Sequence, residues 1–191
     1  MDEAVTGSGT MLSETHIQDL HVHDAVVITC SNRASAGVYD DVSGPLLVEW
    51  LRGLGFEVAD PVVVPDGEPV RAALQEAIDR GAAVVLTTGG TGLTPTDQTP
   101  EVTRELLDRE IPQLSAAIAQ HGVGKGVATA TLSRGLAGVA GSTLVVNLPG
   151  SKGGVKDAME VLEPVLHHAV SQIHGGDHVR RGGHVHGGDH A

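Results

Sequence analysis

Residues 82–92, AAVVLTTGGTG, carry the clearest fold signal in the chain. Their first half is a short, continuous apolar stretch, which is typical of a strand buried on both faces of a sheet. Their second half is a glycine-rich turn at the carboxyl end of that strand, where ligands bind in open α/β sheets. Glycines let the backbone come close to a phosphate, and Thr88 and Thr91 add hydroxyl donors. Such a turn can also be purely structural, and it lacks the pattern of a P-loop or a dinucleotide fingerprint, so other residues must decide its role.

Outward from this run, apolar stretches and helical patterns alternate along the chain. Buried strands are predicted at residues 25–29, 57–64, 82–87 and 143–148. Helices are predicted at residues 45–54, 69–80, 100–109, 112–121 and 155–173, the last of them kinked or divided by Pro164. Gly55 and Gly81 are expected to end the first two helices, and Thr99 to cap the third. The alternation predicts an α/β fold with a mainly parallel sheet and right-handed crossovers.

The chain is predicted to be one domain with polar ends. Its 191 residues suit a single core, and 40% apolar with 2% aromatic residues predict a core of Val, Leu, Ile and Ala. Residues 1–23 show no sustained apolar period and are predicted to be a flexible lead-in, so the domain is expected at residues 24–174. The Gly- and His-rich residues 175–191 are predicted to be a flexible tail, whose imidazoles could bind Ni²⁺ or Zn²⁺.

Composition limits the classes of partner and compartment. A formal charge of −12, with no Lys/Arg cluster in the body of the chain, argues against nucleic acid as the main partner. A small anion remains compatible, because a few well-aimed backbone N–H groups can bind it. We find neither a signal peptide nor an apolar run of roughly 18 residues, so the protein is expected to be cytoplasmic and not membrane-bound. The only cysteine, Cys30, is expected to be a buried thiol at a strand end.

Two aspartates accompany the glycine-rich turn. Asp97 lies shortly after it, and Asp66 follows the strand predicted at residues 57–64. Two carboxylates at neighbouring strand ends, beside a phosphate-binding turn, would suit a Mg²⁺ ion that also binds substrate phosphates. Each aspartate also has a structural interpretation, since Asp66 stands in a Pro-Asp-Gly turn and Asp97 could cap a helix.

A third polar cluster comes late in the chain. Arg134 follows Ser133 and could pair with a phosphate, and Asn147, Pro149 and Gly150 close the strand predicted at residues 143–148. Polar residues followed by Pro-Gly also make an ordinary turn at a strand's end. Both interpretations of this cluster stay open.

Taken together, seven motifs resemble those of the MogA/MoaB family in the same order. They are SNRASAGVYDD at 31–41, SGP at 43–45, VPD at 64–66, GGTG at 89–92, Asp97, LSR at 132–134 and NLPG at 147–150. The resemblance covers roughly residues 24–173 and is far more specific than any one motif. It implies a three-layer α/β/α fold, assembly as a trimer or a pair of trimers, and a molybdopterin pocket at the strand ends.

The resemblance also implies a reaction. Adenylylating members of the family bind Mg-ATP, and the terminal phosphate of molybdopterin attacks the α-phosphate of ATP, which releases pyrophosphate. The adenylylated pterin is then ready for molybdate insertion, by a downstream enzyme. Catalysis would consist mainly of alignment and charge neutralisation, without a protein nucleophile.

By that resemblance, Asp66 and Asp97 match the family's two functional aspartates and are assigned to catalysis and to Mg²⁺ binding. The residues assigned to pterin, phosphate or nucleotide are Gly89, Gly90, Thr91, Gly92, Ser133, Arg134, Asn147, Pro149 and Gly150. Two positions depart from the commonest pattern, namely Asn32, where an aspartate is frequent, and Thr96, where an arginine often stands. A missing guanidinium could weaken phosphate binding by about 1.5 to 3 kcal/mol.

Two other functions stay open at this point. A MoaB-type protein could bind molybdopterin or partners without catalysis, although both aspartates are present here. A nucleotide pyrophosphatase of the competence-damage family has a similar domain. Such an enzyme would liberate AMP with no pterin present.

Overall fold

The computed structural model describes residues 23–175. The predicted lead-in at residues 1–23 and the predicted tail at residues 175–191 lie outside the described residues, apart from His23 and Gly175. The strands are β1 (Asp24–Cys30), β2 (Glu57–Val58), β3 (Val62–Val64), β4 (Val84–Thr88), β5 (Arg109–Glu110), β6 (Ala137–Ala140) and β7 (Thr143–Leu148). The helices are α1 (Asn32–Ser35), α2 (Ser43–Gly53), α3 (Glu68–Asp79), α4 (Thr99–Arg104), α5 (Pro112–Gly124), the 3-10 helix η1 (Ala128–Leu132), α6 (Lys152–Leu162) and α7 (Leu166–Ile173).

The described residues form one seven-stranded sheet, with strand order β2-β1-β4-β7-β6-β5 and with β3 also paired to β1. Strands β1, β2, β3, β4 and β7 run parallel to one another. Strand β6 runs antiparallel to both of its neighbours, β7 and β5. The predicted α/β class and the mainly parallel sheet are therefore confirmed.

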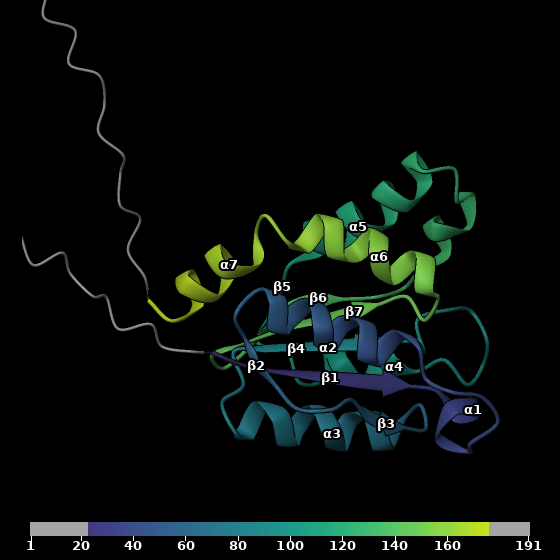
Figure 1. Cartoon of the computed structure of the whole chain (residues 1–191), viewed down its shortest axis with the longest axis horizontal. Helices are drawn as coiled ribbons and strands as arrows, with labels where there is room; N and C mark the ends of the chain where they lie inside the picture. The colour runs from purple at the N-terminus through teal and green to yellow at the C-terminus, as the bar shows by residue number, and fades with distance from the viewer. Residues whose placement is uncertain (1–22, 176–191) are drawn as a thin grey trace, which may run out of the picture.

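Helices cover both faces of the sheet (Figure 1). Helices α2, α5, α6 and α7 pack on one face, and α3 and α4 pack on the other. Along β4, Val84 and Leu86 belong to the first of these two cores and Val85 to the second. This alternation follows from the two-residue period of a strand. The result is the expected three-layer α/β/α arrangement.

The predicted strand at residues 57–64 is wrong as a single element, because two short strands, β2 and β3, form there. Strand β2 pairs with the start of β1, and β3 pairs with its end. Pro61 lies between them, and a proline has no N–H group to donate to the strand ladder. Asp66 still follows β3 by two residues, at the carboxyl end of the sheet.

The second half of the chain contains two strands that the sequence pattern does not predict. Helix α4 ends at Arg104 rather than at residue 109, and β5 follows it and pairs with β6. These strands have two and four residues, too few for an apolar period to be recognised. Pro164 divides the last predicted helix, since α6 ends at Leu162 and α7 begins at Leu166.

Most of the predicted local features are confirmed, with one exception. Gly55 and Gly81 follow α2 and α3 with φ angles of +90° and +76°, as helix-ending glycines do. Cys30 is the buried last residue of β1, and burial raises the pKa of its thiol to about 12. The capping role predicted for Thr99 is wrong, because Gln98 precedes α4 and Thr99 is its first helical residue.

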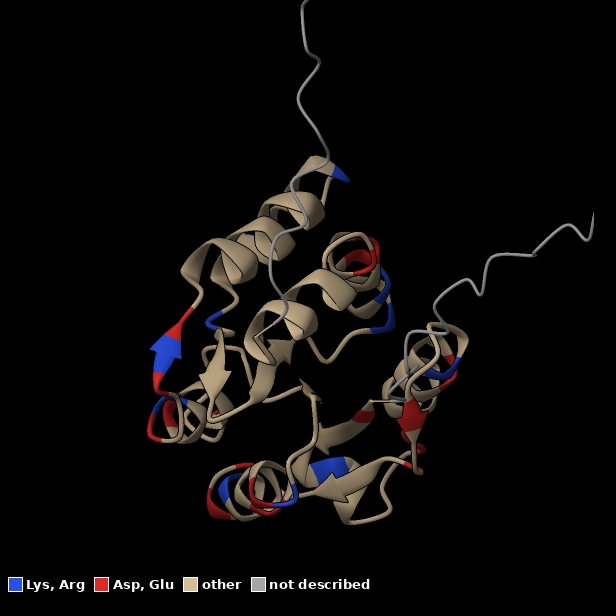
Figure 2. Ribbon diagram, turned by 90° about the vertical axis from the view of Figure 1, so that its left-hand side faces the viewer, with Lys and Arg blue, Asp and Glu red and all other residues tan. Residues whose placement is uncertain are grey.

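Charged residues lie on the outer helices, the loops and the edge strands, with both signs interspersed (Figure 2). The central strands β4 and β7 contain no ionisable side chain and are buried throughout. None of the helices within residues 23–175 combines the length and apolarity that a bilayer crossing requires.

Candidate active site

A cavity of about 710 Å³ lies at the carboxyl ends of β1, β3, β4 and β7. Parallel strands end at the same edge of a sheet, so the loops that follow them converge there. Its charged lining residues are Arg33, Asp40, Asp41, Asp66, Asp97 and Lys152. We call it the acidic cavity. Asp66 and Asp97 line it, and so do the four residues of the glycine-rich turn, Gly89 to Gly92.

Asp66 is a half-buried carboxylate held by three hydrogen bonds. Its Oδ1 accepts from the N–H of Gly67 at 2.7 Å and from the hydroxyl of Thr99 at 3.0 Å. Its Oδ2 accepts from the N–H of Gln98 at 3.1 Å. The amide oxygen of Asn32 accepts from the N–H of Asp66 at 3.1 Å. This bond ties the loop after β3 to the start of α1.

Asp97 is held by a tight turn of its own loop. Its Oδ2 accepts from the N–H of Thr94 at 3.2 Å, and its N–H donates to the carbonyl of Thr94 at 3.0 Å. A methyl group added at Gly92 would lie 2.7 Å from Asp97 Oδ2, so this glycine leaves the space that the carboxylate occupies. The chain thus places Asp97 against one end of the glycine-rich turn.

The charge of Asp97 acts on the carboxyl group of Asp66. Burial raises the pKa of Asp66, and the negative charge of Asp97 raises it further, whereas the hydrogen bonds from Gly67, Thr99 and Gln98 oppose the rise. A like charge nearby disfavours ionisation, and a cation between two carboxylates would reverse that effect. The structure therefore brings together the two residues that the sequence singled out.

The glycine-rich turn can only be built from glycine at two positions. Gly89 and Gly90 have φ angles of +96° and +65°. A methyl group at Gly89 would collide with the carbonyl oxygen of Cys30, and one at Gly90 would collide with the side chains of Asp66 and Thr99. The turn and the Asp66 carboxylate are consequently in direct contact.

Arg134 contacts the backbone of this turn. It lines neither the acidic cavity nor the second cavity that is described below. Its Nε donates to the carbonyl of Gly92 at 2.7 Å, one terminal nitrogen donates to the carbonyl of Asp97 at 2.5 Å, and the other pairs with Glu101. These contacts hold the guanidinium against the loop that carries Asp97, which gives Arg134 a positioning role, and its assignment to a substrate phosphate stays a prediction.

Asn147 is also used internally. Its amide nitrogen donates to the hydroxyls of Thr87 and Thr103, both at 3.0 Å, and its amide oxygen accepts from the N–H of Leu136 at 3.1 Å. The residue is 3% exposed. These polar atoms join β7 to β4, to α4 and to the segment before β6. Asn147 also lines the second cavity, which is described next, so its assignment to a substrate stays a prediction.

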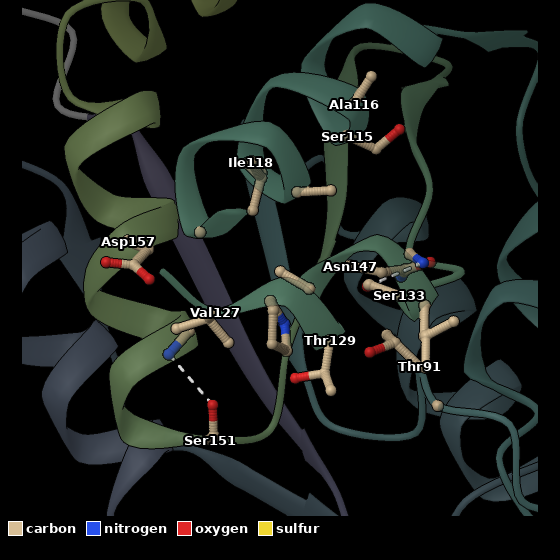
Figure 3. A pocket seen from close by; sticks show the side chains of 18 of the residues that line it. Thr91, Ser115, Ala116, Ile118, Val127, Thr129, Ser133, Asn147, Ser151 and Asp157 are labelled. Carbon is tan, nitrogen blue, oxygen red and sulfur yellow. Dashed lines mark hydrogen bonds between the residues drawn. The ribbon is translucent and has the colours of Figure 1, made fainter. Parts of the chain in front are cut away.

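A second cavity, of about 620 Å³, lies between α5, η1 and α6 (Figure 3). We call it the apolar cavity, because small and hydrophobic residues form most of its wall. They include Leu93, Ala116, Ile118, Ala119, Val127, Ala130 and Leu132. Ser133, one of the predicted substrate-binding residues, lines this cavity and not the acidic one.

The two cavities share part of their walls. Thr91, Gly92, Pro149 and Ser151 line both of them. Gly150, which lines the acidic cavity, accepts a hydrogen bond from the hydroxyl of Ser43 at 3.1 Å through its carbonyl oxygen. The predicted site residues therefore fall into two adjoining hollows rather than one.

Asp41 is a residue of this site that the sequence reasoning missed. Its Oδ1 accepts from the N–H groups of Ser43 and Gly44, at 3.1 and 3.0 Å, and its Oδ2 accepts from the hydroxyl of Thr29 at 2.6 Å. These bonds tie the end of β1 to the start of α2. The signal in the sequence was an aspartate just before a helix that begins Ser-Gly-Pro, which is typical of a helix N-terminus.

The missed residues also include two cations of the acidic cavity. Arg33 lies over the ring of Tyr39, 5.2 Å from its centroid, and the Tyr39 hydroxyl is 2.9 Å from that of Ser31. Lys152 is the first residue of α6, which Ser151 caps by accepting from the N–H of Gly154 at 3.1 Å. Single lysines and arginines carry no recognisable pattern, so their position near the strand ends could only come from the structure.

Known proteins match this fold and these motifs. The family described as "Probable molybdopterin binding domain" matches residues 26–168. A solved structure of the molybdopterin biosynthesis Mog protein from Mycobacterium ulcerans has 50% sequence identity and a TM-score of 0.76, over 80% of this chain and 99% of that chain. The molybdopterin adenylyltransferase of Pyrococcus furiosus is 39% identical over 146 residues, which are 74% of this chain and 86% of that protein.

Other relatives are much longer than the matched segment. The molybdenum cofactor synthesis protein cinnamon of Drosophila melanogaster is 43% identical over 157 residues, which are 80% of this chain and 26% of that protein. The chain covers 48% and 54% of the bifunctional molybdenum cofactor biosynthesis proteins of Synechococcus elongatus and Chlorobaculum tepidum. It thus spans between about a quarter and about half of the length of these relatives. Since the family match includes both aspartates, the glycine-rich turn and the strand ends around them, the chain belongs to the MogA/MoaB family of molybdopterin-binding domains.

Proposed function

We propose that this chain is a molybdopterin adenylyltransferase of molybdenum cofactor biosynthesis, which transfers AMP from Mg-ATP to the terminal phosphate of molybdopterin. The observation that carries the proposal is the placement of Asp66 and Asp97 beside one glycine-rich turn, in a cavity at the ends of parallel strands. Relatives of similar length that bear this name support it.

The chemistry of the two aspartates fits a Mg²⁺ ion. Magnesium prefers one or two carboxylates together with waters and phosphate oxygens. Asp66 is partly desolvated and lies in the field of Asp97, and both effects raise its pKa, so a cation would stabilise the ionised pair. The ion, when bound, would supply positive charge to the phosphates of ATP.

The two cavities offer separate places for two substrates. In this proposal the phosphates of ATP bind in the acidic cavity, where Arg33 and Lys152 provide further positive charge. Molybdopterin binds in the apolar cavity. The reacting phosphates would meet at the shared wall of Thr91, Gly92, Pro149 and Ser151, which holds them at short range and in a fixed orientation.

The reaction needs no nucleophile from the protein. Cys30 lines the acidic cavity, but its thiol is buried and has a pKa of about 12, so it stays protonated at neutral pH. The attacking group is the phosphate of molybdopterin itself. The protein's part is to orient the two phosphates and to neutralise their charge.

An assay of pyrophosphate release tests the proposal and separates it from its alternatives. Purified protein with Mg-ATP should release pyrophosphate only when molybdopterin is added. Binding of molybdopterin without pyrophosphate release would favour the non-catalytic MoaB-type function. Thr96 motivates this test, because it stands where the resemblance leads us to expect an arginine that could bind phosphate. Release of AMP and pyrophosphate without any pterin would favour a nucleotide pyrophosphatase.

The proposal has three further parts. Assembly as a trimer or a pair of trimers and transfer of the product to a molybdate-insertion enzyme are implied by the family resemblance, and a cytoplasmic location is the expectation from the sequence. Light scattering after gel filtration tests the first, with a mass three or six times that of the monomer as the expected result. A monomer at micromolar concentration would contradict it.

A further inference from the structure

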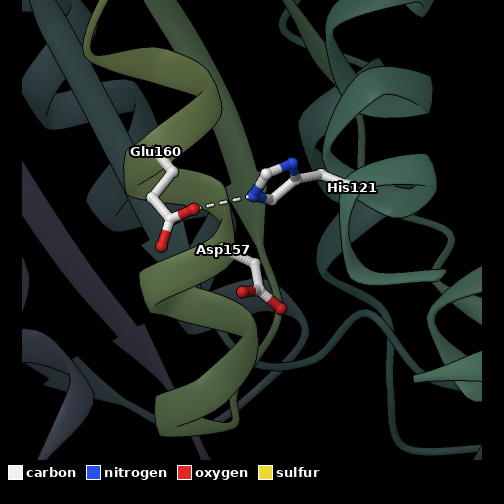
Figure 4. A group of neighbouring side chains, drawn as sticks. All are labelled: His121, Asp157 and Glu160. Atoms are coloured by element: carbon white, nitrogen blue, oxygen red, sulfur yellow. Dashed lines mark hydrogen bonds and ion pairs between the residues drawn. The ribbon is translucent and has the colours of Figure 1, made fainter. Parts of the chain in front are cut away.

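A cluster of charged residues joins the two helices that wall the apolar cavity. His121 Nε2 on α5 lies 2.9 Å from Glu160 Oε2 on α6 (Figure 4). The ammonium of Lys125, the residue directly after α5, lies 2.6 Å from both carboxylate oxygens of Glu160 and 3.0 Å from Oδ1 of Asp157. The ligand atoms of His121, Asp157 and Glu160 are close enough for a metal ion, but Lys125 already supplies the cation. We call these four residues the α5–α6 clasp.

Asp157 is the member of this clasp that reaches the apolar cavity. It extends from α6 and lines the cavity, and its side chain is 14% exposed (Figure 3). Among the described residues that line the cavity, Asp157 is the one that carries a charge. A charge in an apolar surrounding is costly unless it has partners. Lys125 uses one position on Oδ1, and a carboxylate offers about four lone-pair positions, so Asp157 keeps accepting capacity for a ligand.

The two proposed substrates present different edges to a carboxylate. The pyrimidine ring of a pterin has a ring N–H directly beside its 2-amino group, and these two parallel donors match the two oxygens of a carboxylate. Adenine has one amino group flanked by ring nitrogens that are acceptors. It would make one hydrogen bond to a carboxylate and would place a lone pair against the second oxygen. A carboxylate with free acceptor positions in the apolar cavity therefore discriminates in favour of the pterin.

We propose that Asp157 is the specificity-determining residue for the pterin ring, which it binds through the ring N–H and the 2-amino group in the apolar cavity. This inference rests on the proposed function, since it assigns the cavity to one of the two substrates named there. The ammonium of Lys125 holds the carboxylate in place through its contact with Oδ1. A pterin bound at Asp157 directs the rest of the substrate toward Thr91, Ser133 and Ser151, on or next to the wall shared with the acidic cavity.

Fluorescence titration with two simple pteridines tests this inference without ATP. Pterin has the 2-amino group, whereas lumazine has a carbonyl oxygen there and would repel the carboxylate. The wild-type protein should bind pterin about 10- to 100-fold more tightly than lumazine, as expected for a hydrogen bond to a charged group. Asp157→Asn, which keeps the shape of the side chain, should reduce this ratio to nearly one. Equal affinities in the wild type, or an unchanged ratio in Asp157→Asn, would overturn the inference.

Glu160→Gln is the matched control for the clasp. It removes a charge from the same cluster and loosens the contact with Lys125 and His121, but it leaves the carboxylate of Asp157 in the cavity. The pterin-to-lumazine ratio should be retained in this variant. If Glu160→Gln lost the ratio as fully as Asp157→Asn, Asp157 would be a packing residue and the inference would fail.

Steady-state kinetics separate this inference from the proposed function. In Asp157→Asn the KM for molybdopterin should rise about 10- to 100-fold, with the KM for ATP unchanged. An equal rise in both KM values would contradict the assignment of the cavity to the pterin. A wild-type protein that discriminates pterin from lumazine but forms no adenylylated product would refute the proposed function while leaving the recognition by Asp157 intact.

Discussion

Arg134 donates a 2.5 Å hydrogen bond to the backbone carbonyl oxygen of Asp97, and it also binds the carbonyl of Gly92 at 2.7 Å. One guanidinium therefore spans the loop between the glycine-rich turn and the aspartate proposed to bind Mg²⁺. The arginine acts on the site through the backbone, without lining either cavity.

Arg134→Met should loosen the loop that carries Asp97. We expect turnover to fall at least about tenfold, because a small misplacement of a reacting group has a large effect on rate. Hydrogen exchange of the backbone N–H groups at residues 94–97 should become faster. Arg104→Met, which removes only an exposed ion pair to Glu110, is the control and should behave like the wild type. A variant with unchanged exchange but weaker ATP binding would show instead that Arg134 contacts the substrate.

Gly90→Ala should inactivate the site and destabilise the fold. The added methyl group would collide with Asp66 and Thr99, at a backbone position with a φ of +65°. We expect a loss of roughly 1 to 3 kcal/mol in the free energy of unfolding, measured by urea denaturation. Gly53→Ala, in α2 with open space around the new methyl group, should be neutral or slightly stabilising. Equal stability of the two variants would contradict the close contact between the turn and Asp66.

Mg²⁺ should stabilise the protein in a pH-dependent way. Burial raises the pKa of Asp66 above its ordinary value of 3.8, so without metal this carboxyl contributes stability at low pH that is lost as the pH rises through its folded-state pKa. Mg²⁺ requires the ionised form. The rise in melting temperature that Mg²⁺ causes at neutral pH should therefore fade as the pH falls through the raised pKa of Asp66.

Thermal melts with and without Mg²⁺ across the acidic range measure this effect. Asp97→Asn should abolish it, whereas Asp60→Asn should retain it, because the side chain of Asp60 is 97% exposed and lies outside the acidic cavity. A stabilisation by Mg²⁺ that is the same in both variants would place the ion elsewhere.

Cys30 should be unreactive and dispensable for turnover. Its thiol is buried and has a pKa of about 12, so iodoacetamide should not modify the native protein at neutral pH, although it should modify the protein in denaturant. Cys30→Ala should retain activity and lose on the order of 1 kcal/mol of stability, because a small buried group is removed. Loss of turnover in a folded Cys30→Ala variant would contradict a mechanism without a protein nucleophile.

The sequence predicts those parts of the fold that long apolar patterns encode. Strands β1, β4 and β7 are continuous apolar stretches of the sequence. The helices around them show apolar residues at helical spacing. Short elements such as β5 and β6 depend on their partners rather than on a local pattern, so they emerge only in the folded chain. Pro61 lies in the gap between β2 and β3, and Pro164 lies in the gap between α6 and α7. The structure was needed to show where each of these elements ends and the next one begins.

The sequence predicts which residues gather at the candidate site, but not which contacts each of them makes. Asp66, Asp97 and the glycine-rich turn meet because parallel strands end at one edge. The strands before them, β3 and β4, are not neighbours as predicted, since β1 lies between them. The sequence cannot show that the side chains of Arg134 and Asn147 form hydrogen bonds within the protein. Their partners are backbone and hydroxyl groups that lie far away in the sequence. Nor does the sequence show the apolar cavity, which arises where α5, η1 and α6 meet.

Transfer of label from ATP carrying a radioactive α-phosphate tests the central claim most directly. The wild-type protein, with Mg²⁺ and molybdopterin, should move the label onto the pterin, and Asp97→Asn should do so far more slowly while its circular dichroism spectrum stays that of the folded protein. Label found only in free AMP, or the same rate of pterin labelling in Asp97→Asn as in the wild type, would contradict the proposed adenylyl transfer at the paired aspartates.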